Sequence, residues 1–271
     1  MATLTSSITA RRATRWLAGL ATLLVPAAQA TLPPAAEARL QALQQSPEPA
    51  GAWVYDGVVQ ALAEPGGPVL FSYQRRVQAV DGGLVASHLT RDRQGQVLIV
   101  ESASVSADYR LRGFEAVNRQ LGHSGSVQAS ADGRELRYRL VEGGRERSAT
   151  EAIDAPAVTG PSLFGHILRH WDALSAGQAQ AVRLVVLSRL ESIPFEIRRA
   201  DGAGPGRRVF TVTPANWWIR LAVKPLRVEF DEATRQVQRY EGRVPPMQRV
   251  DGRLEPLDAR VDYPRHASIY R

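Results

Sequence analysis

The hydrophobic positions of this chain recur mostly with a period of two, which is the spacing of β-strands. The odd-numbered positions from Val69 to Ala79 are apolar or aromatic, and Arg75 is the one interruption of that pattern. Short turns built on Asp-Gly or Gly-Gly separate similar strand-length runs along the chain, at 81–83, 132–133, 143–144 and 251–252. Alternating runs joined by such turns predict an antiparallel meander.

One segment breaks this rhythm and predicts a single amphipathic helix over about 161–174. Thr159 and Pro161 form a helix-start signal. Apolar residues then recur at helical spacing, at Leu163, Phe164, Ile167, Leu168, Trp171 and Leu174. The strand pattern resumes at 181–190, 195–200, 207–214, 226–230, 236–243 and 257–263, whereas 217–224 fits either a strand or a short helix.

These patterns together predict a mainly β fold in which a strongly bent antiparallel sheet, or half-barrel, wraps around one amphipathic helix. We expect residues 51–271 to form a single β-rich domain. Residues 31–50 are rich in proline and alanine, so we expect a linker or short helix that docks loosely on that domain.

The first thirty residues have the pattern of a cleavable signal peptide. A basic segment that ends at Arg15 precedes an apolar run from Trp16 to Val25, and Ala28 and Ala30 supply small residues before a cleavage site. The apolar run is about ten residues, whereas a helix needs about 20 to span a bilayer. We therefore expect cleavage after Ala30 and a periplasmic, secreted protein.

Composition narrows the possible chemistry. The chain has no cysteine, which excludes a lipid-modified N-terminal cysteine, disulfides, zinc–thiolate sites and thiol catalysis. Lys224 is the only lysine among 34 basic residues, and the arginines are scattered among acids. That distribution argues against a nucleic-acid partner. We expect a monomer without a cofactor.

Two motifs resemble reactive sites without matching them. His166 and His170 lie four residues apart on the predicted helix and are weak metal candidates, but Ile167 stands where a metalloprotease of this type carries glutamate. A structural pair is the preferred interpretation, so no metal is assigned. The sequence Gly-His-Ser-Gly at 122–125 departs from the nucleophile-elbow pattern at Ser126. No catalytic residue is assigned.

Bulky aromatic residues suggest where a ligand would bind. Adjacent residues of a strand face opposite sides, so Trp217 and Trp218 cannot both be buried in one layer. A cavity between a curved sheet and a covering helix suits an acyl chain or another hydrophobic ligand. We assign Phe164, Trp171, Trp217 and Trp218 as candidate ligand-binding residues and expect a dry cavity lined by Phe164, Trp171 and Trp217.

Several segments resemble a group of proteobacterial exported proteins of unknown function that are distantly similar to the periplasmic lipoprotein-carrier and localisation-factor fold. They are GPSLFGHILRHWDALSAGQ (160–178), AVRLVVLSRLESIPFEI (181–197), VKPLRVEFDEATRQVQRYEGR (223–243) and DARVDY (258–263). This resemblance implies a curved antiparallel half-barrel with a helix in its concave face and room for a lipid. It carries over no functional residue.

Three functions remain open on the sequence. The first is non-enzymatic binding of a hydrophobic or amphipathic, lipid-like ligand in the periplasm, with transient membrane contact. The second is an envelope scaffold or protein-interaction module that uses a sheet edge or an arginine-rich face. The third is a periplasmic hydrolase, which would need convergent polar groups in a cleft.

Overall fold

The computed structural model describes residues 32–45, 52–217 and 224–266. The signal peptide expected over 1–30 lies outside these residues, as does most of the ambiguous segment 217–224. In the described part, no helix combines the length and the apolar character that crossing a bilayer requires.

The described elements are three α-helices, one 3₁₀ turn and fifteen strands. The helices are α2 (Pro34–Gln45), α3 (Gly160–Arg169) and α4 (Trp171–Ser175), and the 3₁₀ turn is η1 (Leu187–Arg189). The strands are β1 (Trp53–Ala61), β2 (Phe71–Val80), β3 (Gly83–Arg91), β4 (Val97–Ser106), β5 (Leu111–Asn118), β6 (His123–Ala129), β7 (Glu135–Glu142), β8 (Arg145–Ala152), β9 (Ala157–Val158), β10 (Gln180–Val186), β11 (Glu191–Arg199), β12 (Arg207–Pro214), β13 (Leu226–Asp231), β14 (Val237–Val250) and β15 (Arg253–His266).

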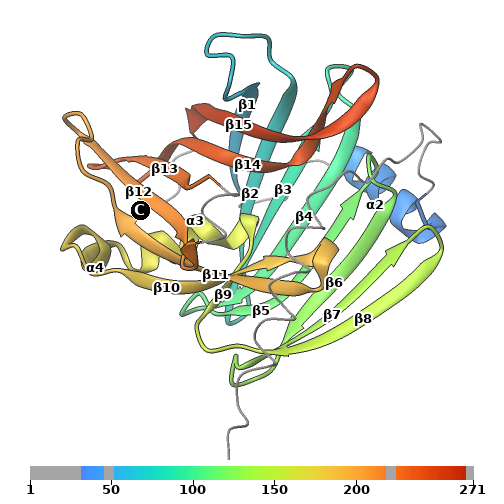
Figure 1. Cartoon of the computed structure of the whole chain (residues 1–271), viewed down its shortest axis with the longest axis horizontal. Coiled ribbons are helices and arrows are strands. Elements are labelled where there is room, and N and C mark those ends of the chain that lie inside the picture. Colours follow the sequence, from blue (N-terminus) through green and yellow to red (C-terminus); the bar gives the residue numbers. More distant parts are fainter. Residues whose placement is uncertain (1–31, 46–51, 218–223, 267–271) are drawn as a thin grey trace, which may run out of the picture.

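All these strands belong to one curved sheet with the order β8-β7-β6-β5-β4-β3-β2-β1-β15-β14-β13-β12-β11-β10-β9 (Figure 1). Neighbouring strands run antiparallel, except for the short parallel pair β9 and β10. The end strands β8 and β9 do not pair with each other, so the sheet is not closed. This architecture confirms the predicted fold class.

The strands form because apolar and polar side chains alternate along them. In β7, Leu136, Tyr138 and Leu140 are buried, whereas Arg137 and Arg139 between them point to solvent. Successive side chains of a strand face opposite sides of the sheet, so this pattern gives each strand one face for the interior.

Two predicted turns have the backbone that hairpins favour. Gly143 and Gly144 join β7 to β8 with φ of 56° and 74°, and Asp251 and Gly252 join β14 to β15 with φ of 47° and 79°. Two consecutive positive φ angles define the turn whose twist matches that of antiparallel strands, and glycine adopts them without a steric penalty.

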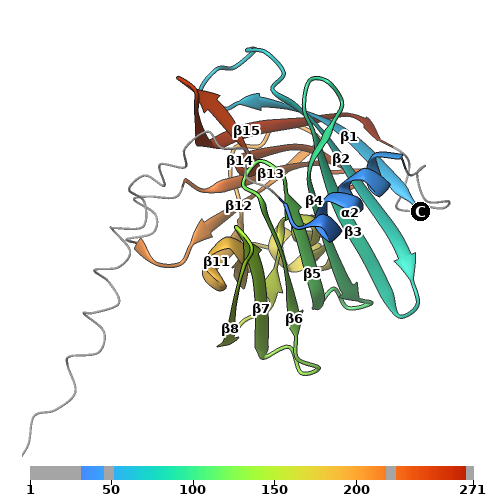
Figure 2. The same cartoon turned by 90° about the vertical axis from the view of Figure 1, so that its right-hand side faces the viewer.

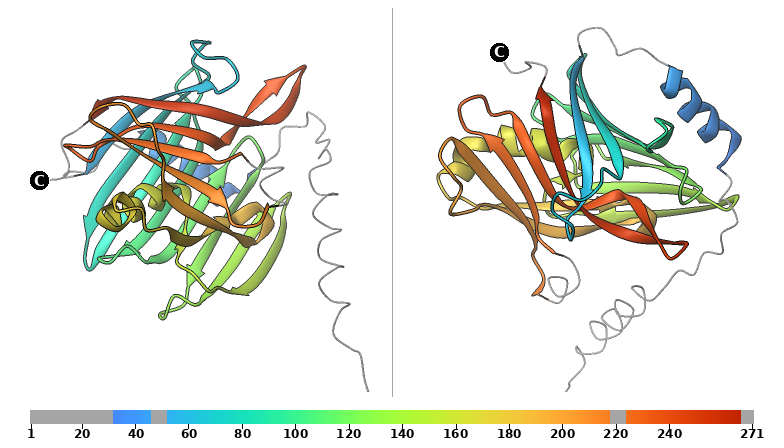
Figure 3. Two further views of the ribbon diagram at one scale, coloured as in Figure 1. Left: turned by 60° about the vertical axis from the view of Figure 1, so that its left-hand side comes forward. Right: turned by 90° about the horizontal axis from the view of Figure 1, so that it is seen from above.

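The predicted helix is present inside the curve of the sheet, but in two pieces (Figure 3). Thr159 caps α3 through a reciprocal pair of bonds with Ser162, as the start signal predicted. The helical path breaks at His170, where φ is −102° and ψ is 18°, and α4 continues from Trp171. The prediction of one continuous helix over 161–174 is therefore wrong, because two helices cover this segment.

The strand expected over 181–190 is also shorter than predicted. It ends at Val186, and η1 then leads into Leu190, which adopts a left-handed backbone with φ of 56°. β11 consequently begins at Glu191 rather than at 195. The apolar run gave no signal for this bend, because η1 buries Leu187 as a strand would.

The concave face of the sheet carries most of the core. Phe164, Ile167, Trp171 and Leu174 of the two helices pack against inward-facing residues of β1, β2 and β10–β15. A second cluster joins the inner faces of β4–β7 to Leu187 of η1 and to β9. The helices and the β10–η1–β11 segment therefore cover the concave face between them.

Helix α2 packs on the opposite, convex face of the sheet, where Figure 2 shows it lying across β3, β4 and β5. Its Leu40 is 0 % exposed and contacts a small apolar cluster that includes Leu89 and Val100. Gln44 accepts a 2.7 Å hydrogen bond from the backbone N–H of Val97. The expectation that this segment docks loosely is wrong for 34–45, because one buried apolar stripe anchors the helix.

A single carboxylate joins the two ends of the open sheet. Glu151 on β8 accepts a 2.6 Å bond from Arg183 of β10 and bonds from the hydroxyl and the backbone N–H of Ser192 on β11, at 3.1 and 2.8 Å. Tyr138 of β7 donates a further bond of 2.9 Å to it. All four partners are donors, so only a group with two acceptor oxygens satisfies them.

The substitution Glu151→Gln should lower the free energy of unfolding by roughly 2–3 kcal/mol, because its amide places a donor against donors in a half-buried site. Urea denaturation of the purified protein measures this change.

Glu146→Gln is the matched control on the same strand, since Glu146 pairs with Arg139 in solvent. That substitution should change the stability by no more than about 0.5 kcal/mol. Equal effects of the two substitutions would contradict a joining role for Glu151.

Candidate functional site

Four polar residues lie side by side on the concave face, where apolar residues surround them. We call Tyr73, Arg75, His88 and Glu101 the interior cluster. The strand register places Arg75 of β2 opposite His88 of β3, and His88 opposite Glu101 of β4. All are buried except Glu101, which is nearly so. The cluster is therefore a built feature of three adjacent strands.

Hydrogen bonds fix the arrangement of the imidazole. Arg75 Nη1 lies 3.1 Å from His88 Nε2, and a guanidinium can only donate, so Nε2 accepts this bond. In the neutral ring the proton is therefore assigned to Nδ1, which is hydrogen-bonded to the Tyr73 hydroxyl. Glu101 Oε2 lies 3.9 Å from the same Nδ1. The ring thus links the arginine to the tyrosine through hydrogen bonds, and the carboxyl group lies beyond hydrogen-bond distance from it.

The start of helix α3 packs over the interior cluster and contacts Arg75. Arg75 Nη1 donates a 2.6 Å hydrogen bond to the carbonyl oxygen of Pro161, and its guanidinium lies 5.2 Å from the centre of the Phe164 ring. A Cβ atom at Gly160 would lie 3.6 Å from Glu101 Oε2. A cavity of about 10 Å³ beside Arg75, bounded also by Tyr109, leaves room for about one water molecule.

Burial shifts the acid–base properties of the cluster. Removal from water raises the pKa of Glu101 to about 7. Burial, and next the charge of Arg75, lower the pKa of His88 well below its usual value. His88 is therefore neutral at neutral pH, while Glu101 changes its charge there. Perturbed groups of this kind gather at functional sites more often than elsewhere.

Two further tyrosines, on strands β14 and β15, lie near the interior cluster and beside Phe164. The rings of Tyr240 on β14 and Tyr263 on β15 lie 6.3 and 6.2 Å from that of Phe164. Burial raises the pKa of both phenols, so both stay protonated. The site therefore combines neutral polar groups, one permanent cation and one carboxyl group within an aromatic enclosure, a mixture suited to a polar head joined to an apolar body.

Sequence reasoning missed most of this site. Arg75 gave a signal, because it interrupts an otherwise apolar face of its strand. Nothing in the sequence paired it with His88 and Glu101, since that requires the register of three strands.

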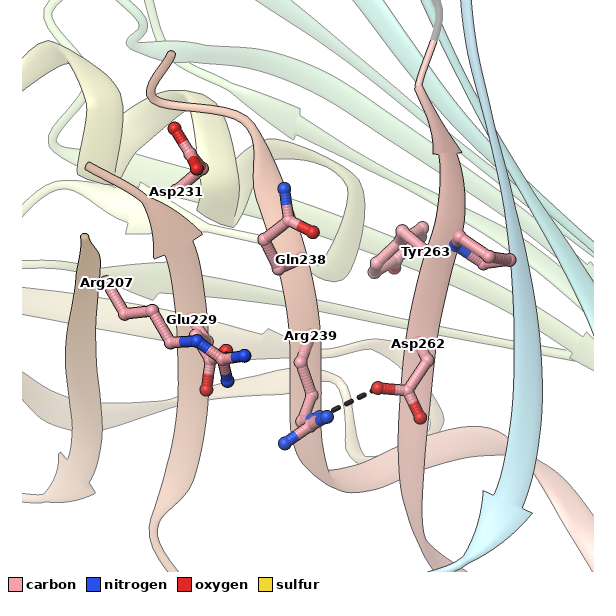
Figure 4. Close-up of a pocket in the computed structure, with 8 residues that line it drawn as sticks. Arg207, Glu229, Asp231, Gln238, Arg239, Asp262 and Tyr263 are labelled. Atoms are coloured by element: carbon pink, nitrogen blue, oxygen red, sulfur yellow. Dashed lines mark hydrogen bonds and ion pairs between the residues drawn. The ribbon is translucent and has the colours of Figure 1, made fainter. Parts of the chain in front are cut away.

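A second hollow lies on the outer face of the sheet, across β12 to β15 (Figure 4). Its volume is about 280 Å³. Four of its charged side chains form ion pairs within the protein, with Arg207 Nη1 2.7 Å from Glu229 Oε1 and Arg239 Nε 2.7 Å from Asp262 Oδ1. The lining residues are Arg207, Glu229, Asp231, Gln238, Arg239, Asp262, Tyr263 and Pro264.

The aromatic residues predicted to bind a ligand lie in different places. Phe164 and Trp171 are buried, and Trp171 makes edge contacts with the rings of Phe210 and Phe230 at 5.3 and 5.5 Å. Trp217 is 57 % exposed, whereas Trp218 lies outside the described residues. Phe164, Trp171 and Trp217 therefore do not line one common cavity, because neighbouring rings fill the space beside Trp171.

The predicted histidine pair does come together at the end of α3. The ring centres of His166 and His170 are 4.6 Å apart. Burial, and next the neighbouring His170, lower the pKa of His166 to about 4. In residues 32–45, 52–217 and 224–266, no group of three or more potential ligand side chains gathers around a point that could hold a metal.

The interior cluster predicts a pH-dependent stability. The pKa of Glu101 is higher in the folded protein than in the unfolded chain, so folding takes up a proton between about pH 4.5 and 7. The contribution of this group to stability therefore falls as the pH rises through that window. Glu101→Gln removes the cost of ionisation, and it should gain up to roughly 3 kcal/mol over wild type between pH 4.5 and 8.

Urea denaturation of both proteins from pH 4.5 to 8 measures this difference. His88 acts in the opposite direction, because its lowered pKa costs stability as the pH falls, but it is present in both proteins and largely cancels. Glu135→Gln, at an exposed ion pair with Arg137, is the control and should show no such pH dependence. A difference between E101Q and wild type that stays constant with pH would refute the shifted pKa.

No family model matches the chain, and no curated protein matches it. Among solved structures, a β-barrel-like protein of the domain of unknown function DUF1849 from Brucella abortus is similar over 81 % of this chain and 97 % of its own, with 11 % identity and a TM-score of 0.42. A protein from Bacteroides fragilis, described as exported and as having a YmcC-like fold, is similar over 82 % and 97 %, with 9 % identity and a TM-score of 0.27. Both TM-scores are below 0.5, so the description of the fold rests on this chain itself.

Proposed function

We propose that the protein is an exported, non-enzymatic binding protein that takes up an amphipathic, lipid-like ligand in the periplasm. The observation that carries this proposal is the interior cluster, a compact polar site within the aromatic and aliphatic concave face of an unclosed sheet. A ligand with a polar head and an apolar body matches both parts of that surface.

The polar head would meet Arg75 and the hydroxyl groups around it. Arg75 is held by a carbonyl oxygen, an imidazole and an aromatic face. A ligand oxygen could replace the Pro161 carbonyl as acceptor, because that carbonyl belongs to the start of a helix rather than to the sheet. The head would then bind where α3 now begins.

The apolar body would lie between the sheet and the helices, against Phe164 and Trp171. Phe164 and Trp171 already fill the concave face, so a chain-like ligand can enter only if α3 and α4 shift outwards. We keep the exposed Trp217 as a candidate contact of this ligand, and Trp218 stays a prediction because it lies outside the described residues. Transient contact of a monomer with a membrane would deliver such a ligand.

A second candidate function is an envelope scaffold or interaction module. The first half of edge strand β8, residues 145–148, favours it, because its side chains are exposed and β8 pairs only with β7 in the sheet, whereas Glu151 joins the second half to β10 and β11. An exposed edge of this kind can accept a strand from a partner.

Native mass spectrometry of protein isolated from the periplasm of its own cells tests the binding proposal. We expect a bound amphipathic molecule on the wild-type protein. Phe164→Ala should lower the bound fraction severalfold, because the phenyl ring lies between the interior cluster and the apolar face.

Phe114→Ala is the matched control. Phe114 is also 4 % exposed but belongs to the second apolar cluster, so it should cost similar stability, about 3–5 kcal/mol, and retain the ligand. Circular dichroism establishes that both variants are folded. A wild-type protein that carries only a protein partner would support the scaffold instead, and an empty one would contradict both proposals.

A further inference from the structure

A pair of imidazoles ends helix α3, away from the interior cluster at its start. His166 and His170 are four positions apart, so their side chains lie on the same face of successive turns. Their ring centres are 4.6 Å apart with an angle of 41° between the planes. Two imidazoles at this spacing can reach one ion together.

One ring of the pair has a nitrogen atom without a hydrogen-bond partner in the described part of the chain. His166 Nε2 is buried, and no partner for a hydrogen bond is found within the described part of the chain. Leaving a buried polar nitrogen without a partner costs free energy. Such an atom in a folded protein requires an explanation, and an ion is one of those available.

The neighbouring carboxylates are engaged elsewhere. Asp172 lies 3.3 Å from Arg235, and Asp108 lies 2.8 Å from Arg110. The nearby Arg169 is a cation, so it offers the imidazoles no countercharge. The pair therefore presents neutral nitrogen donors rather than an ion pair.

We propose that His166 and His170 form a two-imidazole site for a divalent transition-metal ion. Water would supply the remaining ligands from the side of His170, which is only partly buried. Nitrogen donors of this type bind Cu²⁺ more tightly than Ni²⁺ or Zn²⁺. This inference is independent of the proposed ligand, because it concerns the other end of the helix and uses none of the interior cluster.

Titration of the untagged mature protein with Cu²⁺ tests the site. Trp171 follows His170 directly, so bound Cu²⁺ should quench its fluorescence, and the electron paramagnetic resonance spectrum should show two nitrogen ligands. We expect one ion per chain. His170→Ala should weaken binding on the order of tenfold or more, since one of the two protein ligands is lost.

Further variants keep the test decisive. The double variant H166A/H170A should abolish the quenching, and Asp172→Asn, a change beside the pair at an exposed residue, should leave it unchanged. Bound Cu²⁺ should raise the Tm of the wild-type protein more than that of His170→Ala. A cooperative thermal transition of His170→Ala without metal establishes that this variant is folded. Equal affinity of His170→Ala and wild type, or loss of binding in Asp172→Asn, would overturn the two-imidazole site.

Discussion

A sheet whose end strands do not pair with each other leaves a concave face that must be covered. In this protein, segments between strands β9 and β11 cover that face. Helices α3 and α4 lie against one part of it, and η1 covers another. Glu151 then holds β8 to β10 and β11, so that the open sheet behaves like a nearly closed one. The hydrophobic effect drives this arrangement, because each covered side chain leaves water.

The same cover sets the chemistry of the polar groups beneath it. Arg75, His88 and Glu101 face inward because of the strand register, and α3 then removes them from water. Without that cover, Glu101 would titrate as an ordinary carboxyl group. Helix α3 completes the core and, by removing Glu101 from water, raises the pKa of this carboxyl group to about 7. The same packing contact therefore makes the site sensitive to pH near neutrality.

Sequence patterns predicted the fold better than the site. Alternation along the strands, Gly-rich turns and the cap at Thr159 are local signals, and each predicted its element. The break at His170 and the bend after Val186 have no local signal, because the apolar pattern continues through both. Glu151 could not be predicted either, since its partner Ser192 lies 41 residues away in sequence.

The candidate site shows the same limit. Arg75 stands out in its strand, because it interrupts an apolar face. His88 and Glu101 can be recognised as its neighbours only when the register of the three strands is known. The aromatic ligand-binding assignment rests on residue type alone, and the structure separates the buried Phe164 from the exposed Trp217. The most direct measurement of the central claim, a concave face that the helices shield from bulk water, is a carbon-13 NMR titration of the Glu101 carboxyl group in the folded protein. A midpoint near pH 7 is predicted, whereas a midpoint near 4.5, as in the unfolded chain, would show that water reaches the cluster and would contradict the account.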